Sequence, residues 1–478
     1  MDTGRSITSG IWDNSHMFTP DTYRARRNRL KKDIGSGLLL FLGNEEVGMN
    51  YTANIYPFRQ DSTFLYFWAV DQPGVAALID IDQDTETLFG DDQTIADVVW
   101  SGPLPTLTDR CAPAGIAAHA PSSALAVRLA EAIRQGRRVH FLAPYRAEHT
   151  ETLCVLLGLH APTARAYRSE VLHKAIIAQR SYKTPEEVAD LDAAVNISRE
   201  MYAAAMRTAR PGKYEYEVVA EISRVALAHG GRFSFPPICS VHGETLHNPF
   251  YRNQMQAGDV MILDSGAETS HYNASDITRT IPVGGTFTAQ QKLIYDMVLR
   301  AQLAAIDAIT PGVRYLDVHL LAARSFAIDL TAAGLMTGDV DEAVAAGAHA
   351  LFFPHGLGHM LGMDVHDMEN LEERLVGYRP GLDRSAQFGL GYLRLAREVE
   401  PGFVLTVEPG LYFIPALIDQ WKADGTHKAF INFAEVEKFR HARGYRIEDD
   451  VFVTQDGHRV LGQPIPKTVA DVEAACQG

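Results

Sequence analysis

The chain has 478 residues, of which 46% are hydrophobic and 22% charged, and this composition is typical of a globular protein with a large core. The length is sufficient for two domains. The formal net charge of −15 argues against nucleic acid or an anionic membrane as a main partner, because both bind basic surfaces.

The cysteines and the N-terminal stretch bear on the cellular compartment. The four cysteines show no CxxC pairing and no regular spacing, which indicates reduced thiols in a cytoplasmic protein. Residues 1–18 contain no apolar core, so we expect no signal peptide. We also expect no transmembrane helix, because no stretch approaches about 18 apolar residues.

The N-terminal part, residues 1–180, has the pattern of an α/β domain. Short apolar runs between glycines or turn residues predict strands at 38–42, 75–81, 86–90 and 138–142, and an apolar stripe predicts a helix at 124–136. The aromatic and polar stretch 58–66 is interpreted as one more strand, in which hydrogen bonds hold Arg59. We identify no catalytic constellation in this part of the sequence.

A second domain is expected at 181–478, and it starts with a strong helix signal. Thr184 and Glu187 form a capping box around Pro185, which predicts a helix that runs to about residue 208. Pro211-Gly212 ends that helix, and a second helix is predicted at 215–229.

The same order of signals then recurs. A capping box at 288–291 opens a helix to residue 309, Pro311-Gly312 ends it, and another helix is predicted at 316–333. The two Pro-Gly pairs lie 100 residues apart. The repetition favours an internally duplicated α+β domain, while two unrelated helix pairs remain the alternative.

Two aspartates lie on a predicted hairpin between these helix pairs. Asp264 follows a short apolar run, Gly266 permits a turn or a bulge, and Asp276 precedes the predicted strand 277–281. Two carboxylates at one spot repel each other unless protons or cations lie between them. The alternative is a pair of solvated turn residues.

Four other stretches carry further carboxylates and histidines. They are Leu246-His247-Asn248, the run from His355 through His359 to His366, Thr406-Val407-Glu408-Pro409-Gly410, and Arg446-Ile447-Glu448. Each alone is explained by a hydrogen-bonded histidine or a plain turn. Strand alternation predicts that Arg446 and Glu448 share one face.

Together these groups suggest a metal site. Four carboxylates at strand ends, with one imidazole, would bind two hard or borderline divalent cations with water between them. The absence of cysteine from the set argues against a structural zinc site. Because the carboxylates come from both halves of the duplicated domain, their strands are expected to converge.

The order D…D…HGLGH…VEPG…RIEDD resembles the metallopeptidase family of aminopeptidase P, prolidase and methionine aminopeptidase, with its pita-bread catalytic fold. The stretch FRQDSTFLYF resembles the N-terminal domain shared by aminopeptidase P and prolidase. The resemblance therefore covers nearly the whole chain. It implies an α/β creatinase-like domain followed by a pita-bread domain with a pseudo-two-fold duplication.

The resemblance also implies roles for individual residues. The implied ligands of two divalent ions, with manganese as first choice, are Asp264, Asp276, His359, Glu408 and Glu448. Asp276 and Glu448 would bridge the ions, and Glu408 would pass a proton from water towards the leaving proline nitrogen. Three histidines, His247, His355 and His366, match the family's histidines that contact substrate or support the ligands. Arg446 matches the arginine beside the last glutamate. His247 and His366 would stabilise the oxyanion.

One departure from the family pattern lies in the hairpin. The step from Asp264 to Asp276 is one residue longer than is usual in the family, with the extra residue expected near 269–272. A turn or a bulge can absorb it, whereas a changed strand face would point Asp276 away. We expect absorption, because the sequence on both sides is intact.

The substrate is expected to be an Xaa-Pro peptide. The segment YFIPALIDQWKADG and the arginine Arg394 in LRLAR resemble prolidase, an Xaa-Pro dipeptidase, and imply that Arg394 binds the free carboxylate of a dipeptide. Alternatives are an Xaa-Pro aminopeptidase acting on longer peptides and, remotely, a metal-free binding module. The resemblance also implies a homodimer, with 12–18 as a candidate partner-facing stretch.

Overall fold

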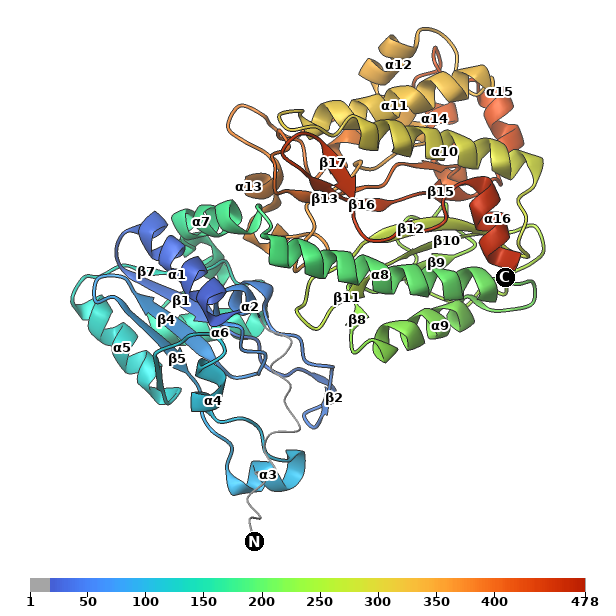
Figure 1. Ribbon diagram of the computed structural model, residues 1–478. Coiled ribbons are helices and arrows are strands. Elements are labelled where there is room, and N and C mark those ends of the chain that lie inside the picture. Colours follow the sequence, from blue (N-terminus) through green and yellow to red (C-terminus); the bar gives the residue numbers. More distant parts are fainter. Residues whose placement is uncertain (1–17, 478) are drawn as a thin grey trace. The chain divides into compact units, whose positions relative to one another are not determined.

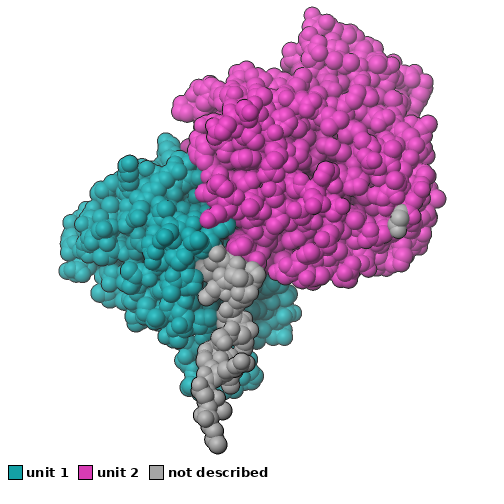
Figure 2. All heavy atoms as spheres, viewed as in Figure 1, with its two compact units in different colours: residues 1–179 teal, residues 180–478 magenta. Residues whose placement is uncertain are grey.

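The computed structural model describes residues 18–477. The chain divides into two compact units, residues 1–179 and 180–478, which Figure 2 distinguishes by colour. The predicted partner-facing stretch 12–18 lies, except for its last residue, outside the described residues. Within the described part of the chain, no helix is long and apolar enough to cross a membrane.

Unit 1 is built on a five-stranded mixed sheet. The strand order is β6-β5-β4-β1-β7, where the bounds are Leu38–Leu42 (β1), Ala76–Asp80 (β4), Thr85–Phe89 (β5), Ala118–Ala120 (β6) and Val139–His140 (β7). β4 pairs antiparallel with β1 and β5, while β7 and β6 add parallel strands at the two edges. The predicted hairpin around residue 83 is confirmed, and the strand expected at 138–142 is shorter.

Helices cover this sheet (Figure 1). Leu125 and Leu129 of α5 pack with Leu40 of β1 and Leu153 of α6 in one buried cluster. The remaining elements are α1 (Pro20–Ile34), β2 (Gly48–Tyr51), β3 (Asn54–Ile55), α2 (Ser62–Trp68), α3 (Ile95–Ser101), α4 (Leu107–Cys111), α5 (Ser123–Arg134), α6 (Ala147–Leu157), η3 (Ala161–Tyr167) and α7 (Glu170–Arg180).

The strand interpretation of 58–66 is wrong, because helix α2 occupies its second half. The Asp61 carboxylate accepts a hydrogen bond from the Phe64 N–H and caps this helix. Every residue of α2 is buried, so the helix shows no amphipathic period that a sequence pattern could reveal. Arg59 is hydrogen-bonded as expected, donating to the Gln60 carbonyl and the Ser62 hydroxyl.

Unit 2 places its strands between two helix pairs (Figure 1). These pairs are α8 (Pro185–Thr208) with α9 (Glu215–Ala228), and α10 (Ala289–Asp307) with α11 (Tyr315–Ala332). The predicted capping boxes at Thr184 and Thr288 are both present. In each Pro-Gly pair the glycine N–H donates to a carbonyl that is distant in the chain. Gly212 donates to Met255 and Gly312 to Val399, both at 2.8 Å. The duplication expected from the sequence is therefore present in the hydrogen bonds.

Each half contributes a three-stranded sheet. One has the order β12-β10-β9 and the other β13-β16-β17, with bounds Ile238–Ser240 (β9), Val260–Ser265 (β10), Ile277–Pro282 (β12), Val404–Val407 (β13), Asp449–Val453 (β16) and His458–Val460 (β17). The halves meet where the Glu448 N–H donates to the Thr278 carbonyl at 3.0 Å.

Shorter elements complete unit 2. The two-stranded sheets pair β8 (Arg232–Phe233) with β11 (Ala267–Glu268) and β14 (Gly410–Tyr412) with β15 (Gly444–Arg446). The rest are α12 (Val340–Ala346), η4 (Ala348–Leu351), η5 (Glu369–Leu371), α13 (Glu373–Gly377), η6 (Leu390–Tyr392), α14 (Pro415–Asp424), α15 (Phe433–Val436), η7 (Glu437–Phe439) and α16 (Val469–Gln477).

Candidate metal centre

The hairpin formed by β10 and β12 places two carboxylates on one face. Asp264 of β10 pairs with Thr278, and Asp276 lies two residues before Thr278, so both aspartates follow the same side of the pleat. The same register continues to the pair Glu268 and Ala274 near the turn. The hairpin therefore turns within residues 269–273, where the sequence led us to expect the extra residue, and no bulge intervenes between this turn and Asp276.

Glu448 reaches this spot from the second half, although the single strand predicted for Arg446 and Glu448 is wrong. The chain breaks at Ile447 between β15 and β16, where the pairing partner changes from β14 to β13. Thr278 compensates for the break. Its hydroxyl donates to Glu448 Oε2 at 2.7 Å and accepts from Arg446 Nε at 3.2 Å, so both side chains still face the hairpin.

His359 faces the carboxylates with a nitrogen lone pair. Its Nδ1 lies 3.1 Å from the Met360 carbonyl, which can only accept, so Nδ1 carries the proton. Its Nε2 lies 3.4 Å from Asp276 Oδ2 and 3.6 Å from Glu408 Oε1. Burial lowers the pKa of His359 to about 4. A neutral ring that turns a lone pair towards carboxylate oxygens is unfavourable without a cation between them.

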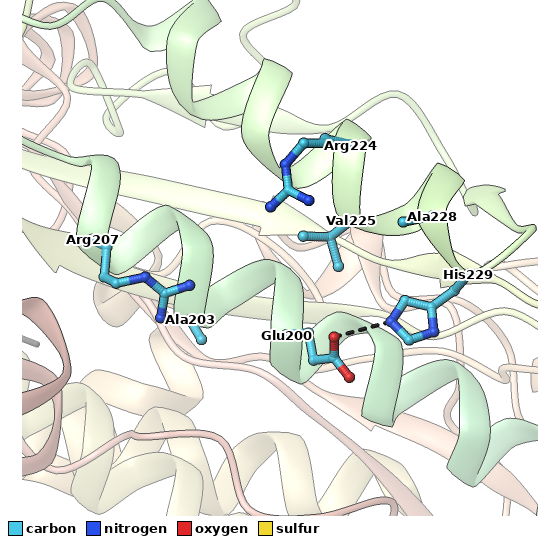
Figure 3. Close-up of a pocket in the computed structure, with 7 residues that line it drawn as sticks. All are labelled: Glu200, Ala203, Arg207, Arg224, Val225, Ala228 and His229. Atoms are coloured by element: carbon cyan, nitrogen blue, oxygen red, sulfur yellow. Dashed lines mark hydrogen bonds and ion pairs between the residues drawn. The ribbon is translucent and has the colours of Figure 1, made fainter.

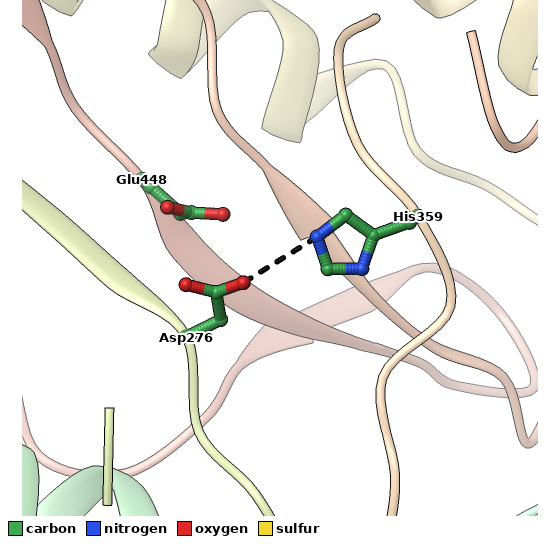
Figure 4. A group of neighbouring side chains, drawn as sticks. All are labelled: Asp276, His359 and Glu448. Atoms are coloured by element: carbon green, nitrogen blue, oxygen red, sulfur yellow. Dashed lines mark ion pairs between the residues drawn. The ribbon is translucent and has the colours of Figure 1, made fainter. Parts of the chain in front are cut away.

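The ligand-type atoms of Asp276, His359 and Glu448 all lie within 4.8 Å of one another (Figure 4). Three buried carboxylate oxygens in the cluster accept no hydrogen bond from any described residue, namely Asp264 Oδ1, Asp276 Oδ1 and Glu448 Oε1. Buried polar atoms without partners are costly. These three oxygens therefore gain a partner only when a further positive group binds among them.

The mutual repulsion of these groups also appears in their proton affinities. Burial and then the charge of Asp264 raise the pKa of Asp276 well above its ordinary value. Burial and then the charge of Asp276 do the same to the pKa of Glu448. For Glu408, which follows β13, burial raises the pKa to about 8. Divalent cations bound between these carboxylates would remove this cost.

Arg446 and Tyr412 hold one side of the cluster. Arg446 donates to Asp264 Oδ2 at 2.7 Å and to the Tyr412 hydroxyl at 2.6 Å. The Tyr412 hydroxyl lies 3.0 Å from His355 Nε2, while His355 Nδ1 faces the Gly356 carbonyl at 2.8 Å. His355 therefore orients Tyr412 and Arg446, and its closest carboxylate atom is Glu408 Oε2 at 3.8 Å.

The remaining predicted residues lie around this cluster. The ring of His366 is centred 4.2 Å from that of His359, and its Nδ1 lies 2.7 Å from Glu369 Oε2. His247 lies in the exposed loop between β9 and β10. Partial burial and then the charge of Arg446 lower its pKa. Both histidines thus belong to the surroundings of the candidate ligands.

Arg394 lines a small cavity with His359 and His366. Its Nη1 donates to Glu369 Oε1 at 2.7 Å and to Glu373 Oε2 at 2.9 Å. Sequence reasoning did not anticipate these two carboxylates. A substrate carboxylate that approaches Arg394 would therefore compete with two glutamates of the chain itself.

Sequence reasoning also missed three side chains that orient the candidate ligands. They are Thr278, Tyr412 and Asp450, whose carboxylate accepts a hydrogen bond from the Asp276 N–H at 3.0 Å. Strand alternation places Thr278 on the face of Asp276 and could have identified it. Tyr412 carries no such local signal.

A separate hollow of about 320 Å³ lies between α8 and α9. Figure 3 shows Arg207 and Arg224 near this hollow, with Glu200 and His229 joined by an ion pair of 3.0 Å. None of the predicted site residues lines it. This hollow is therefore distinct from the carboxylate cluster.

Two family models match the chain. The model of metallopeptidase family M24 matches residues 189–455, and that of the aminopeptidase P N-terminal domain matches residues 23–140. The chain belongs to metallopeptidase family M24. This membership agrees with the ordered carboxylates and histidines described above and identifies the chain as a peptidase.

Relatives of this M24 peptidase include both of the expected activities. The Xaa-Pro dipeptidase of Homo sapiens is 33% identical over 464 residues, covering 94% of this chain and 91% of the relative. The Xaa-Pro aminopeptidase of Escherichia coli (strain K12) is 32% identical over 472 residues, covering 95% and 96%. Sequence identity therefore does not separate the two activities.

Solved structures agree with the fold. Pseudomonas aeruginosa aminopeptidase PepP superimposes with a TM-score of 0.79 at 28% identity, covering 96% of this chain and 98% of that chain. An Escherichia coli aminopeptidase P in complex with substrate gives a TM-score of 0.78 at 29% identity, covering 96% and 99%. The pita-bread fold and the prolidase and aminopeptidase P family are thus established for this chain.

Proposed function

We propose that this peptidase hydrolyses Xaa-Pro bonds at a site for two divalent ions held by Asp264, Asp276, His359, Glu408 and Glu448. The observation that carries the proposal is the His359 lone pair facing buried carboxylates that have unpartnered oxygens. Manganese is the first choice, because one imidazole among carboxylate oxygens suits it. Bound ions would polarise the scissile carbonyl and lower the pKa of a water molecule.

The chain's own groups have separable roles in this proposal. Glu408 accepts a proton from water and passes it towards the proline nitrogen. His247 and His366 face the developing oxyanion. Glu369 Oε2 lies 2.7 Å from His366 Nδ1 and accepts a hydrogen bond from it, which keeps a proton on that nitrogen. Arg446 and His355 orient Asp264 and Tyr412 through the hydrogen bonds described above.

Within the family, we propose the dipeptidase activity. Arg394 is a guanidinium beside His359 and His366 in one cavity, and such a group suits the planar carboxylate of an Xaa-Pro dipeptide. The competing Glu369 and Glu373 favour the second candidate, an Xaa-Pro aminopeptidase, because they partly neutralise Arg394. Peptide length therefore decides between the two.

The test is a length series with Xaa-Pro, Xaa-Pro-Yaa and a longer peptide, each with manganese. A tripeptide would carry its carboxylate past Arg394 and leave the guanidinium facing a neutral amide, which costs about 30- to 1000-fold in specificity. We expect dipeptides to be preferred by a factor in this range. Equal cleavage of dipeptide and tripeptide would replace the dipeptidase proposal with the aminopeptidase.

A variant at Arg394 tests the same proposal from the protein side. Arg394→Ala should raise the KM for dipeptides and leave bound metal unchanged, because Arg394 is not a proposed ligand. It should also narrow the gap between dipeptides and tripeptides, since the group that rejected the longer peptide is gone. An unchanged dipeptide KM would contradict the role of Arg394 in binding the carboxylate.

We also propose a homodimer. Helix α3 of unit 1 has no buried residue, and three of its apolar side chains are strongly exposed, Ile95 at 82%, Val99 at 76% and Trp100 at 89%. Contiguous exposed apolar side chains of this kind support a protein contact. A second copy of the chain is the partner that the family resemblance favours.

A further inference from the structure

Helix α8 carries one row of polar groups along the hairpin that bears Asp264 and Asp276. The row runs through Asp190, Ser198 and Tyr202, with the Ala194 carbonyl between the first two. Residues four apart form one ridge of a helix, and the row spans about 18 Å from its first member to its last. Each member bonds to the hairpin at a different level.

The C-terminal end of the row bonds at the level of the two aspartates. The buried Tyr202 hydroxyl lies 3.0 Å from the Leu263 carbonyl, directly before Asp264. It also contacts the Ile277 carbonyl, directly after Asp276. Tyr202 therefore touches the backbone of both strands beside the carboxylates.

Ser198 bonds one step closer to the turn. Its hydroxyl accepts from the Ala267 N–H at 3.0 Å and lies 2.9 Å from the Ser275 hydroxyl. Ser275 Oγ in turn donates to the Ala194 carbonyl at 3.2 Å. The two strands approach so closely here that a side chain on Gly266 would collide with the Ser275 carbonyl.

Asp190 binds the turn of this hairpin, residues 269–273. Its carboxylate accepts from Thr269 Oγ1 at 2.6 Å and from Asn273 Nδ2 at 2.7 Å. Its second oxygen lies 2.9 Å from His271 Nδ1. The turn needs such support, because Tyr272 adopts a φ of 68°, which is uncommon for a residue with a large side chain.

We propose that Asp190 and Ser198 are positioning residues that hold the register of this hairpin, and the proposal rests on the proposed ligand set. Without the three bonds to Asp190 the turn would shorten, and one of its residues would enter a strand as a bulge. A shift of one residue turns Asp276 to the opposite face. Fixing the turn thus keeps Asp264 and Asp276 on one side.

The experiment measures metal binding rather than activity alone. The chelator-treated protein is titrated with Co²⁺, and the visible absorption of the bound ion reports both affinity and coordination. Asp190→Ala should weaken Co²⁺ binding about 10-fold, the lower range for residues that orient ligands, and change the spectrum. Ser198→Ala should act in the same direction and serves if Asp190→Ala does not fold.

Two further variants isolate the reason for the effect. Deleting Ser270, an exposed turn residue, shortens the turn, and combined with Asp190→Ala it should restore the affinity. Glu200→Gln is the matched control, because Glu200 lies on α8 at the hollow shared with α9 (Figure 3). It should leave binding unchanged.

Two outcomes would overturn the proposal. One is that Asp190→Ala and Ser198→Ala lower the melting temperature but leave Co²⁺ affinity and spectrum unchanged. The other is that deletion of Ser270 does not restore binding to Asp190→Ala. If the proposed ligand set itself is wrong, Asp276→Asn would bind Co²⁺ as tightly as the parent does. This result distinguishes an error in the ligand set from an error in the roles of Asp190 and Ser198.

Discussion

At the scale of single residues, the orientation of one imidazole ring limits what the site can hold. The Met360 carbonyl fixes the proton of His359 on Nδ1 and leaves Nε2 as an acceptor facing Asp276 and Glu408. Hydrogen bonds to Thr278 and Arg446 likewise fix one oxygen each of Glu448 and Asp264 and leave the other oxygen without a described partner. Such an arrangement is suited to cations.

Loss of a single ligand should therefore remove the metal while the fold survives. Asp276→Ala and Glu408→Ala are expected to lower metal affinity by more than about 100-fold, since even residues that only orient ligands contribute 10- to 100-fold. Hydrolysis should fall nearly to the background. Metal content after dialysis against Mn²⁺, with circular dichroism to verify folding, is the measurement, and a variant with two bound ions and full turnover would contradict the assignment.

At the scale of elements, helix α11 and the turn η4 bury two histidines that the proposed reaction does not use. His319 and His349 are 0% and 1% exposed, and none of their four ring nitrogens has a hydrogen-bond partner among the described residues. Burial lowers the pKa of His319 to about 3 and that of His349 to about 4. Both rings must stay neutral in the folded chain.

This burial predicts sensitivity to mild acid. A histidine with a depressed folded pKa loses stability as pH falls below its unfolded value of about 6.5, because the unfolded chain binds the proton first. Between pH 7 and 5 the His319 contribution should decrease by about 2 kcal/mol. Urea unfolding at both pH values is the measurement. Between pH 7 and 5 the free energy of unfolding should fall by about 2 kcal/mol less in His319→Leu than in the parent. An equal fall in both proteins would exclude His319 as the cause.

At the scale of the whole molecule, the buried carboxylates link metal, pH and stability. In the metal-free chain the pKa of Glu408 is raised to about 8, so the folded state holds a proton that the unfolded state has released above about pH 4.5. Stability from this group is therefore present at low pH and lost as pH rises towards 8. Bound cations would replace the proton.

We accordingly expect the chelator-treated protein to have a lower Tm at pH 8 than at pH 6. The rise in Tm on adding Mn²⁺ should be larger at pH 8 for the same reason. Thermal unfolding with and without metal at both pH values tests this. A metal-induced shift that is larger at pH 6 would show that the carboxylate cluster does not control the response.

The exposed apolar helix α3 leads to a prediction about assembly. Sedimentation should give a mass near twice 52.6 kDa, and Trp100→Glu should shift the protein towards the monomer by placing a charge in the contact. Val127→Glu is the matched control, because Val127 is also exposed, at 67%, but lies on α5. A parent protein that is monomeric at micromolar concentration would contradict the homodimer.

The sequence by itself determined the features that depend on residues close together in the chain. The capping boxes at Thr184 and Thr288 and the strands before Asp264 and Glu408 follow from residues only a few positions apart. The order of candidate ligands indicated the family in the same way. Absorption of the extra residue by a turn or a bulge was also expected from the intact sequence on either side.

Only the tertiary structure decided which atoms face each other. Arg446 bonds to Asp264 across 182 positions, and Arg394 bonds to Glu369 of η5 and Glu373 of α13. The prediction of a strand at 58–66 failed in its second half, where α2 lies, because burial on all sides removes the amphipathic period that marks a helix in a sequence. Partners distant in the chain leave no periodic signal. The row of polar groups on α8 likewise finds its hydrogen-bond partners only when the hairpin lies along it.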